Sequence, residues 1–300
     1  MFNHSIKSWL MATRPWSFPA SAMPIIVTCA YLFWLGEPVN WYLGLWTLVN
    51  IVLFHAAANC WSDYRDYMKG VDREDTIGGT SIVSGEFKAS EIKGLSFTLL
   101  AVATAAGIGL MLCTGMELLY FGLAGLVLII AYPWLKYHAL GDLDILLTYS
   151  VLPIMGTSYV VLGYIDLETA WLMLPIGLIT VGILHINNSR DIEQDRRANI
   201  RTLAMLMGKR LSAWVYVAEM LLPFVIIVIA VICGAMPWWS MAVAVALKPA
   251  IDNCRAAMKL PSEGMKAVAG VDEKTAQLQL VFSLLLTLSF IMPELISCVK

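Results

Sequence analysis

The sequence predicts an all-α membrane protein with nine transmembrane helices in one bundle, built as a single domain over residues 1–300. Its 300 residues are 59% hydrophobic and only 14% charged, whereas a soluble domain carries about 25% charged residues. The apolar residues also form long runs rather than the short alternating segments of a transmembrane β-barrel. Both observations exclude a water-soluble fold and favour a bundle of membrane-spanning helices.

Nine apolar segments are each close to the roughly 20 residues that an α-helix needs to cross the hydrocarbon core. The eighth is the least regular, because Lys248 and Pro249 interrupt it. The predicted spans cover residues 17–35, 41–61, 92–113, 117–134, 143–163, 169–188, 212–233, 236–254 and 276–297.

The cationic residues predict the orientation of these helices. With nine spans, 19 of the 20 Lys and Arg residues fall at the N-terminus or in alternate loops, and only Lys300 falls on the other side. Cytoplasmic loops of membrane proteins carry an excess of Lys and Arg. We therefore expect a multi-pass protein of the cytoplasmic (inner) membrane, with a cytoplasmic N-terminus, an external C-terminus and the long polar loops inside the cell.

Two polar segments with the same pattern follow the second and sixth predicted spans. In each, an amide precedes two carboxylates at intervals of three or four residues, so that a continuing helix would present all three on one face. The two sets are Asn59, Asp63 and Asp66, and Asn187, Asp191 and Asp195. Clustered carboxylates repel one another, and a divalent cation relieves that repulsion. Oxygen-only ligands favour Mg²⁺ over zinc.

Lysines and arginines interleaved with these acids suit a diphosphate better than a metal alone. A diphosphate at the mouth of an apolar bundle indicates a polyprenyl diphosphate, with its hydrocarbon tail among the helices. The alternative without a ligand is that both segments are solvated loops of mixed charge. Two matching segments, each after a helix that ends in Asn, argue against that alternative. A transporter is the other alternative, although both segments leave the membrane on the same side and so are not inverted repeats.

Several motifs then resemble the UbiA superfamily of intramembrane prenyltransferases. Residues 63–72 (DYRDYMKGVD) are similar to the motif N-D-Y-x-D-x-x-x-G-x-D, with Ser62 in place of the first Asn, and residues 187–195 (NNSRDIEQD) match N-N-x-R-D-x-x-x-D. The remaining similar stretches are residues 14–19 (RPWSFP), 132–136 (YPWLK), 156–159 (GTSY) and 201–204 (RTLA). Within the superfamily, the chain looks most like the branch that prenylates 1,4-dihydroxy-2-naphthoate in menaquinone biosynthesis.

This resemblance implies a transferase that moves a polyprenyl group from its diphosphate to an aromatic acceptor with Mg²⁺ as cofactor. Catalytic metal ligands would be Asp63, Asp66, Asp191 and Asp195, with Asp72 as a further ligand. Contacts to the diphosphate would come from Asn59, Lys69, Arg73, Lys136, Asn187, Arg190 and Arg196. Acceptors such as 4-hydroxybenzoate, or another quinone or lipid precursor, stay open.

The expected partners are the two substrates and the lipid bilayer, with no nucleic acid and no obligate protein partner. His55 and His185 are candidates for the base that activates the acceptor, although a single His at a helix end is more often a hydrogen-bonding residue. Glu219 is noteworthy because an ionisable group within a membrane span is costly.

Overall fold

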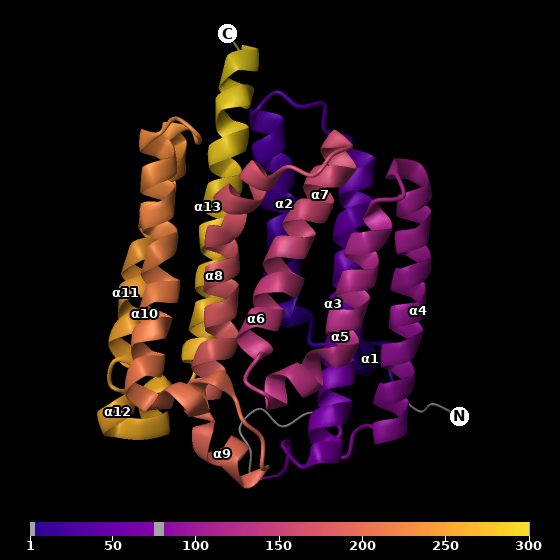
Figure 1. Ribbon diagram of the computed structural model, residues 1–300, viewed down its shortest axis with the longest axis vertical. Helices are drawn as coiled ribbons and strands as arrows, with labels where there is room; N and C mark the ends of the chain where they lie inside the picture. Colours follow the sequence, from indigo (N-terminus) through magenta and orange to yellow (C-terminus); the bar gives the residue numbers. More distant parts are fainter. Residues whose placement is uncertain (1–3, 75–80, 300) are drawn as a thin grey trace.

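A computed structural model describes residues 4–74 and 81–299, and those residues form helices without strands. Figure 1 shows the helices running alongside one another in a bundle. The first half comprises α1 (Ile6–Ala12), η1 (Pro15–Ser17), α2 (Pro19–Trp34), α3 (Trp41–Lys69), α4 (Ala89–Thr114), α5 (Leu118–Tyr137), α6 (Gly141–Leu146), the π-helical η2 (Leu147–Val151) and α7 (Leu152–Leu162). The second half comprises α8 (Leu167–Arg190), α9 (Ile192–Arg197), α10 (Leu203–Ile232), η3 (Trp238–Ala246), α11 (Leu247–Ala257), α12 (Leu260–Glu263), η4 (Gly264–Val268) and α13 (Val271–Val299).

Within the described residues, eight helical segments are long and apolar enough to cross a membrane. The predicted span 236–254 is instead divided into the 3₁₀ segment η3 and the α-helix α11. Pro249 lies in the first turn of α11, where a residue without an N–H is tolerated. Because it cannot donate to a preceding carbonyl, Pro249 prevents one α-helix from running through η3 and α11. In Figure 1 these two segments return the chain from the upper to the lower end of the bundle, and a ninth crossing stays a prediction.

Local sequence signals fix where the helices begin and end. The Asn40 side chain accepts hydrogen bonds from the backbone of Tyr42 and Leu43 and so caps α3. Asp166 caps α8 in the same way, through the backbone of Glu168 and Thr169. At its other end α3 stops at Gly70, whose φ of 72° is left-handed. The long helix α3 therefore carries the first acidic motif on its final turns.

The second motif is built differently from the continuous helix that its spacing predicts. Helix α8 ends at Arg190, Asp191 is its C-cap with φ −95° and ψ 11°, and the short helix α9 follows. One backbone hydrogen bond, from Asp195 N to Asp191 O, still links the two acids across the bend. The chain therefore turns between Arg190 and Ile192 rather than continuing into the loop as one helix.

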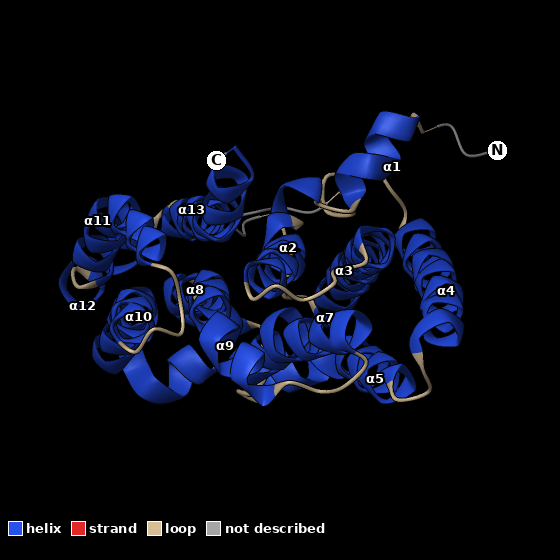
Figure 2. Ribbon diagram, turned by 90° about the horizontal axis from the view of Figure 1, so that it is seen from above, coloured by secondary structure: helices blue, strands red, loops and turns tan. Residues whose placement is uncertain are grey.

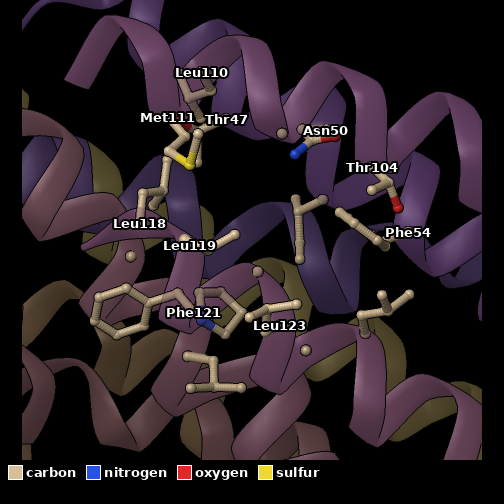
Figure 3. Close-up of a pocket in the computed structure, with 18 of the residues that line it drawn as sticks. Thr47, Asn50, Phe54, Thr104, Leu110, Met111, Leu118, Leu119, Phe121 and Leu123 are labelled. Carbon is tan, nitrogen blue, oxygen red and sulfur yellow. The ribbon is translucent and has the colours of Figure 1, made fainter. Parts of the chain in front are cut away.

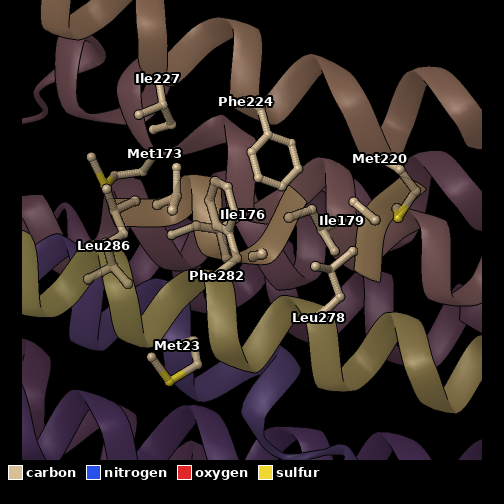
Figure 4. Packing of buried hydrophobic residues seen from close by; sticks show 14 of the residues in the cluster. Met23, Met173, Ile176, Ile179, Met220, Phe224, Ile227, Leu278, Phe282 and Leu286 are labelled. Atoms are coloured by element: carbon tan, nitrogen blue, oxygen red, sulfur yellow. The ribbon is translucent and has the colours of Figure 1, made fainter. Parts of the chain in front are cut away.

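The main hydrophobic core lies between α2, α8, α10 and α13, where it holds the bundle together. Figure 4 shows Phe282 of α13 between Ile176 of α8 and Phe224 of α10, and the rings of Phe224 and Phe282 meet edge-on at 5.3 Å. Seen end-on in Figure 2, α4 and α5 lie at one edge of the bundle and α10 to α12 at the opposite edge. The acidic motifs of α3 and α8–α9 belong to the end at which α9 and α12 lie in Figure 1.

Gly177 of α8 packs against η2 so closely that a side chain does not fit. A Cβ at this position would lie 2.0 Å from Ser150 Oγ and 2.4 Å from Ser150 Cβ. We expect Gly177→Ala to reduce stability by about 1–3 kcal/mol, the usual cost of overpacking, as a lower thermal midpoint in detergent. Gly94→Ala in α4 is the matched control, because nothing lies within 4 Å of its added Cβ. Equal midpoints for both variants would contradict this packing.

Candidate active site at one end of the bundle

The first acidic motif is buried although it lies at a helix end. Asp63 and Asp66 of α3 are 4% and 6% exposed. Arg14 approaches from the segment before α2, and its Nη2 lies 2.5 Å from Asp63 Oδ1. Arg14 has a left-handed backbone (φ 56°), which is costly for a residue with a side chain. Arg14 adopts this conformation while its side chain forms the ion pair with Asp63.

Asp66 is held by two donors from the end of α5. Lys136 Nζ donates to Asp66 Oδ2 at 2.9 Å, and Tyr137 Oη donates to Asp66 Oδ1 at 2.6 Å. Ser62, which replaces the Asn of the family motif, donates to the same carboxylate at 3.4 Å. Ser62 therefore supports Asp66 from one helical turn away.

Arg190 organises the second motif. Its Nε and Nη2 donate to the two carboxylate oxygens of Asp191, each at 2.8 Å, which is a bidentate pair. Nη1 donates to Asp272 Oδ2 at 2.7 Å, and Nη2 also donates to Asn187 Oδ1. Arg190 thus ties the end of α8 to the start of α13.

Electrostatic coupling links the two motifs. Burial raises the pKa of Asp195 to about 7, against the lowering effect of Lys136 and with further raising by Asp191 and Asp66. Burial, followed by the charge of Asp66, also raises the pKa of Asp72 to about 6. The carboxylates of the two motifs therefore lie near enough for their charges to raise one another's pKa.

The other predicted contacts are more dispersed. Asn59 Nδ2 donates to the Thr13 carbonyl at 2.9 Å and to Ser17 Oγ at 3.0 Å, and so anchors the N-terminal segment to α3. Lys69 and Arg196 are exposed, Arg73 is half-buried, and Arg196 pairs with Glu193 at 2.9 Å. A role for these four residues at a diphosphate stays a prediction.

The sequence did not assign roles to three residues that the structure brings to the site. Arg14 could have been suspected because it is the last cation before the first predicted span. Tyr137 follows Lys136 directly but has no motif of its own. Asp272 lies 82 residues from its partner Arg190, and no local pattern marks it.

An apolar cavity of about 260 Å³ lies between α3, α4, α5 and α7. Figure 3 shows Phe54 and Asn50 of α3 on one side, and Phe121 and Leu123 of α5 on the other. Phe54 precedes Asp63 by nine residues on the same helix, which corresponds to roughly 14 Å along its axis. The cavity therefore lies deeper in the bundle than the carboxylates and can accept hydrocarbon.

Comparison with known proteins identifies the family. Residues 22–251 match the UbiA prenyltransferase family. The chain belongs to this family. UbiA prenyltransferase domain-containing protein 1 of Danio rerio is 31% identical over 287 residues, which cover 92% of this chain and 82% of that protein. The Rattus norvegicus protein of the same name is 34% identical over 228 residues, covering 74% and 67%.

Solved structures share the fold of this UbiA family member. A UbiA homologue from Aeropyrum pernix K1 superposes with a TM-score of 0.68 at 14% identity, covering 97% of this chain and 99% of that chain. A homologue from Archaeoglobus fulgidus, described as bound to GPP and Mg²⁺, gives 0.60 at 12% identity, covering 93% and 99%. The family assignment makes the chain a prenyltransferase of the membrane.

The bidentate geometry of Arg190 predicts that a lysine cannot replace it. The Arg190 side chain is 7% exposed, and an ammonium cannot contact Asp191, Asp272 and Asn187 together. We expect Arg190→Lys to reduce stability by about 1.5–3 kcal/mol, the range for hydrogen bonds to charged groups, measured by thermal unfolding in detergent. Arg196→Lys, whose side chain is 65% exposed, is the control and should unfold like the wild type. A fully stable Arg190→Lys would exclude this linking role.

Proposed function

We propose that this chain transfers a polyprenyl group from a prenyl diphosphate to an aromatic quinone precursor, with Mg²⁺ as cofactor. The observation that carries the proposal is the presence of two largely buried carboxylate motifs and their cations at the same end of a bundle that also holds an apolar cavity. The same arrangement also suits other prenyl acceptors of the family. The similarity of residues 63–72, 156–159 and 201–204 to the naphthoate branch favours 1,4-dihydroxy-2-naphthoate, whose prenylation gives the reduced quinol form of a demethylmenaquinone.

The donor set fits Mg²⁺ in its chemistry. The candidate ligands Asp63, Asp66, Asp191 and Asp195 offer only oxygen, with Asp72 as a fifth carboxylate, and Mg²⁺ prefers carboxylates together with substrate phosphates. The raised pKa values of half-buried Asp72 and buried Asp195 support the same conclusion, since a cation would allow both acids to ionise. Bound Mg²⁺ would supply positive charge that stabilises the departing diphosphate.

The residues of the chain have separate tasks in this reaction. Lys136 and Arg14 can exchange part of their contact with Asp66 and Asp63 for diphosphate oxygens, which places the donor at the bundle end. The cavity beside Phe54 takes the prenyl tail and keeps water from the allylic carbon. As the allylic C–O bond breaks, its electron pair leaves with the diphosphate, and a ring carbon of the acceptor forms the new C–C bond. With a naphthoate acceptor, the carboxylate is lost as CO₂ and its bonding pair stays on the ring.

A first test identifies the product. Membranes containing the protein are incubated with labelled prenyl diphosphate and a panel of aromatic acids, and the product is identified by mass. We expect a prenylated naphthoquinol with loss of CO₂ when 1,4-dihydroxy-2-naphthoate is present. Prenylation of 4-hydroxybenzoate alone would show that the proposed acceptor is wrong and the proposed prenyl transfer is right. The absence of a prenylated product with any acid would contradict the proposal.

A second test examines the acids. Asp63→Asn or Asp191→Asn removes one negative ligand at nearly constant size, so we expect the rate to fall by roughly a hundredfold or more, beyond the loss seen for supporting residues of metal sites. The fold should persist at reduced stability, because the asparagine oxygen can still accept a hydrogen bond from Arg14 or Arg190 although the ion pair is lost. Asp252→Asn, on the exposed surface of α11, is the control with unchanged activity. Near-wild-type turnover of both variants at limiting Mg²⁺ would overturn the assignment.

A third test concerns orientation, which we propose from the distribution of cations. Single cysteines at Asn199 and at Leu167 are introduced after the native cysteines have been replaced by alanine. Membrane-impermeant maleimide should label Asn199→Cys only from the cytoplasmic side and Leu167→Cys only from outside. Labelling of both sites from the same side would contradict the proposed topology and the cytoplasmic active site.

A further inference from the structure

A second charged cluster lies in the interior of the bundle, where α6, α8 and α10 meet. Asp142, His185 and Glu219 are 6%, 0% and 9% exposed. One ligand atom from each lies within 4.8 Å of those of the others. His185 Nδ1 is 2.5 Å from Asp142 Oδ2 and 3.9 Å from Glu219 Oε1. The steps proposed for prenyl transfer assign no role to these three residues, apart from the prediction from the sequence that His185 is a candidate base for the acceptor.

The hydrogen bonds on the other side of the ring assign the proton of His185. Ser189 Oγ donates to the His185 carbonyl at 2.7 Å, and Ser189 Oγ lies 2.7 Å from Ser212 Oγ. Ser212 Oγ therefore donates to Ser189 and is left as an acceptor. His185 Nε2, which lies 3.1 Å from the Ser212 carbonyl and 3.0 Å from Ser212 Oγ, must be the donor. A ring N–H bound to a carbonyl, with the other nitrogen facing carboxylates, is the arrangement of a metal-binding histidine.

Glu219 adds an independent observation. It is nine-tenths buried, and its Oε2 has no hydrogen-bond partner among the described residues. Gly182 of α8 makes room for the neighbouring Met220, because a Cβ there would lie 2.4 Å from Met220 Cε, while its 3.4 Å distance to Glu219 Oε2 is an ordinary contact. A buried, unpartnered carboxylate oxygen costs free energy unless a proton or cation binds it.

The charges of the cluster also favour a bound cation. When both are ionised, Asp142 and Glu219 place two negative charges in the apolar bundle, where isolated charges are expensive. A protonated His185 would compensate only one of them. A divalent cation with a neutral imidazole compensates both, and it also gives Glu219 a partner.

We propose that Asp142, His185 and Glu219 bind a divalent transition-metal ion of the zinc class, separate from the Mg²⁺ at the acidic motifs. One imidazole nitrogen and two carboxylates are a donor set that zinc accepts. Zinc bonds of about 2.0–2.2 Å hold ligand atoms roughly 3.3 Å apart in tetrahedral geometry, so the ion separates His185 Nδ1 from Asp142 Oδ2. The ion joins α6, α8 and α10 and thereby fixes the end of α8, six residues before Asp191.

The test uses the purified full chain in detergent, freed of metal by a chelator and kept in excess Mg²⁺. Co²⁺ is the spectroscopic probe and Zn²⁺ its competitor, and bound metal is counted by mass spectrometry after gel filtration. We expect one Zn²⁺ per chain and a raised thermal midpoint. Glu219→Gln and His185→Gln should each weaken Zn²⁺ binding at least tenfold. His138→Gln, an exposed histidine that bonds to the Trp134 carbonyl, should bind like the wild type.

Further variants keep the result independent of catalysis. Asp63→Asn and Asp191→Asn should retain Zn²⁺ binding even if they abolish prenyl transfer, so failure of one site is distinguishable from failure of the other. If His185→Gln does not fold, Glu219→Gln decides, because it preserves size and changes only the charge. Absence of stoichiometric Zn²⁺ in the wild type, or unchanged affinity in Glu219→Gln, would overturn the proposal and leave an imidazolium paired with Asp142.

Discussion

The mutual repulsion of buried carboxylates at the end of α3 and at the α8–α9 bend is the constraint on which the rest of the site depends. Asp63 and Asp66 are nearly inaccessible to water, so water cannot screen their charges as it screens a surface cluster. Asp63 pairs with Arg14 and Asp66 with Lys136, each on a different segment of the chain. Asp191 pairs with its neighbour Arg190, which in turn reaches Asp272 at the start of α13. The polar end is therefore assembled by tertiary contacts rather than by any one helix.

The apolar bundle provides a hydrocarbon environment next to the charged end, and the two together determine which substrate fits. The core around Phe282 and Phe224 fixes α8, α10 and α13 relative to one another, and Arg190 extends that connection to the polar end through Asp272. The cavity lies between α3, α4, α5 and α7, and α3 and α5 also carry Asp66 and Lys136 of the polar end. A substrate with a charged head and a hydrocarbon tail matches both parts at once, as the family assignment also implies.

Much of this arrangement could be predicted from the sequence because helix length and charge spacing are local signals. The run from Trp41 to Lys69 forms one helix, as the spacing of Asp63 and Asp66 predicts. The bend at Asp191 could not be predicted, because a spacing of four residues is compatible with both a continuous helix and a capped turn. The division of residues 236–254 into η3 and α11, between Ala246 and Leu247, was indicated only by Lys248 and Pro249.

The partners of the acids were harder to predict than the acids. Arg14 and Asp272 reach the motifs through contacts between segments far apart in the chain. Such contacts produce no periodic pattern in the sequence. Asn59 shows the opposite case: its spacing suggests a role at the diphosphate, yet its amide binds Thr13 and Ser17. His185 and Glu219 stood out as polar residues in apolar spans, but their proximity to Asp142 is a property of the fold alone.

The central claim, that both acidic motifs form one metal–diphosphate site, is tested most directly by a double-mutant cycle on the binding of inorganic diphosphate in the presence of Mg²⁺. The affinities of the wild type, Asp66→Asn, Asp195→Asn and the double variant are measured by calorimetry. One shared site predicts strong non-additivity, with the second substitution adding little to the first. Additive losses, or diphosphate binding that does not change when Mg²⁺ is removed, would contradict the account.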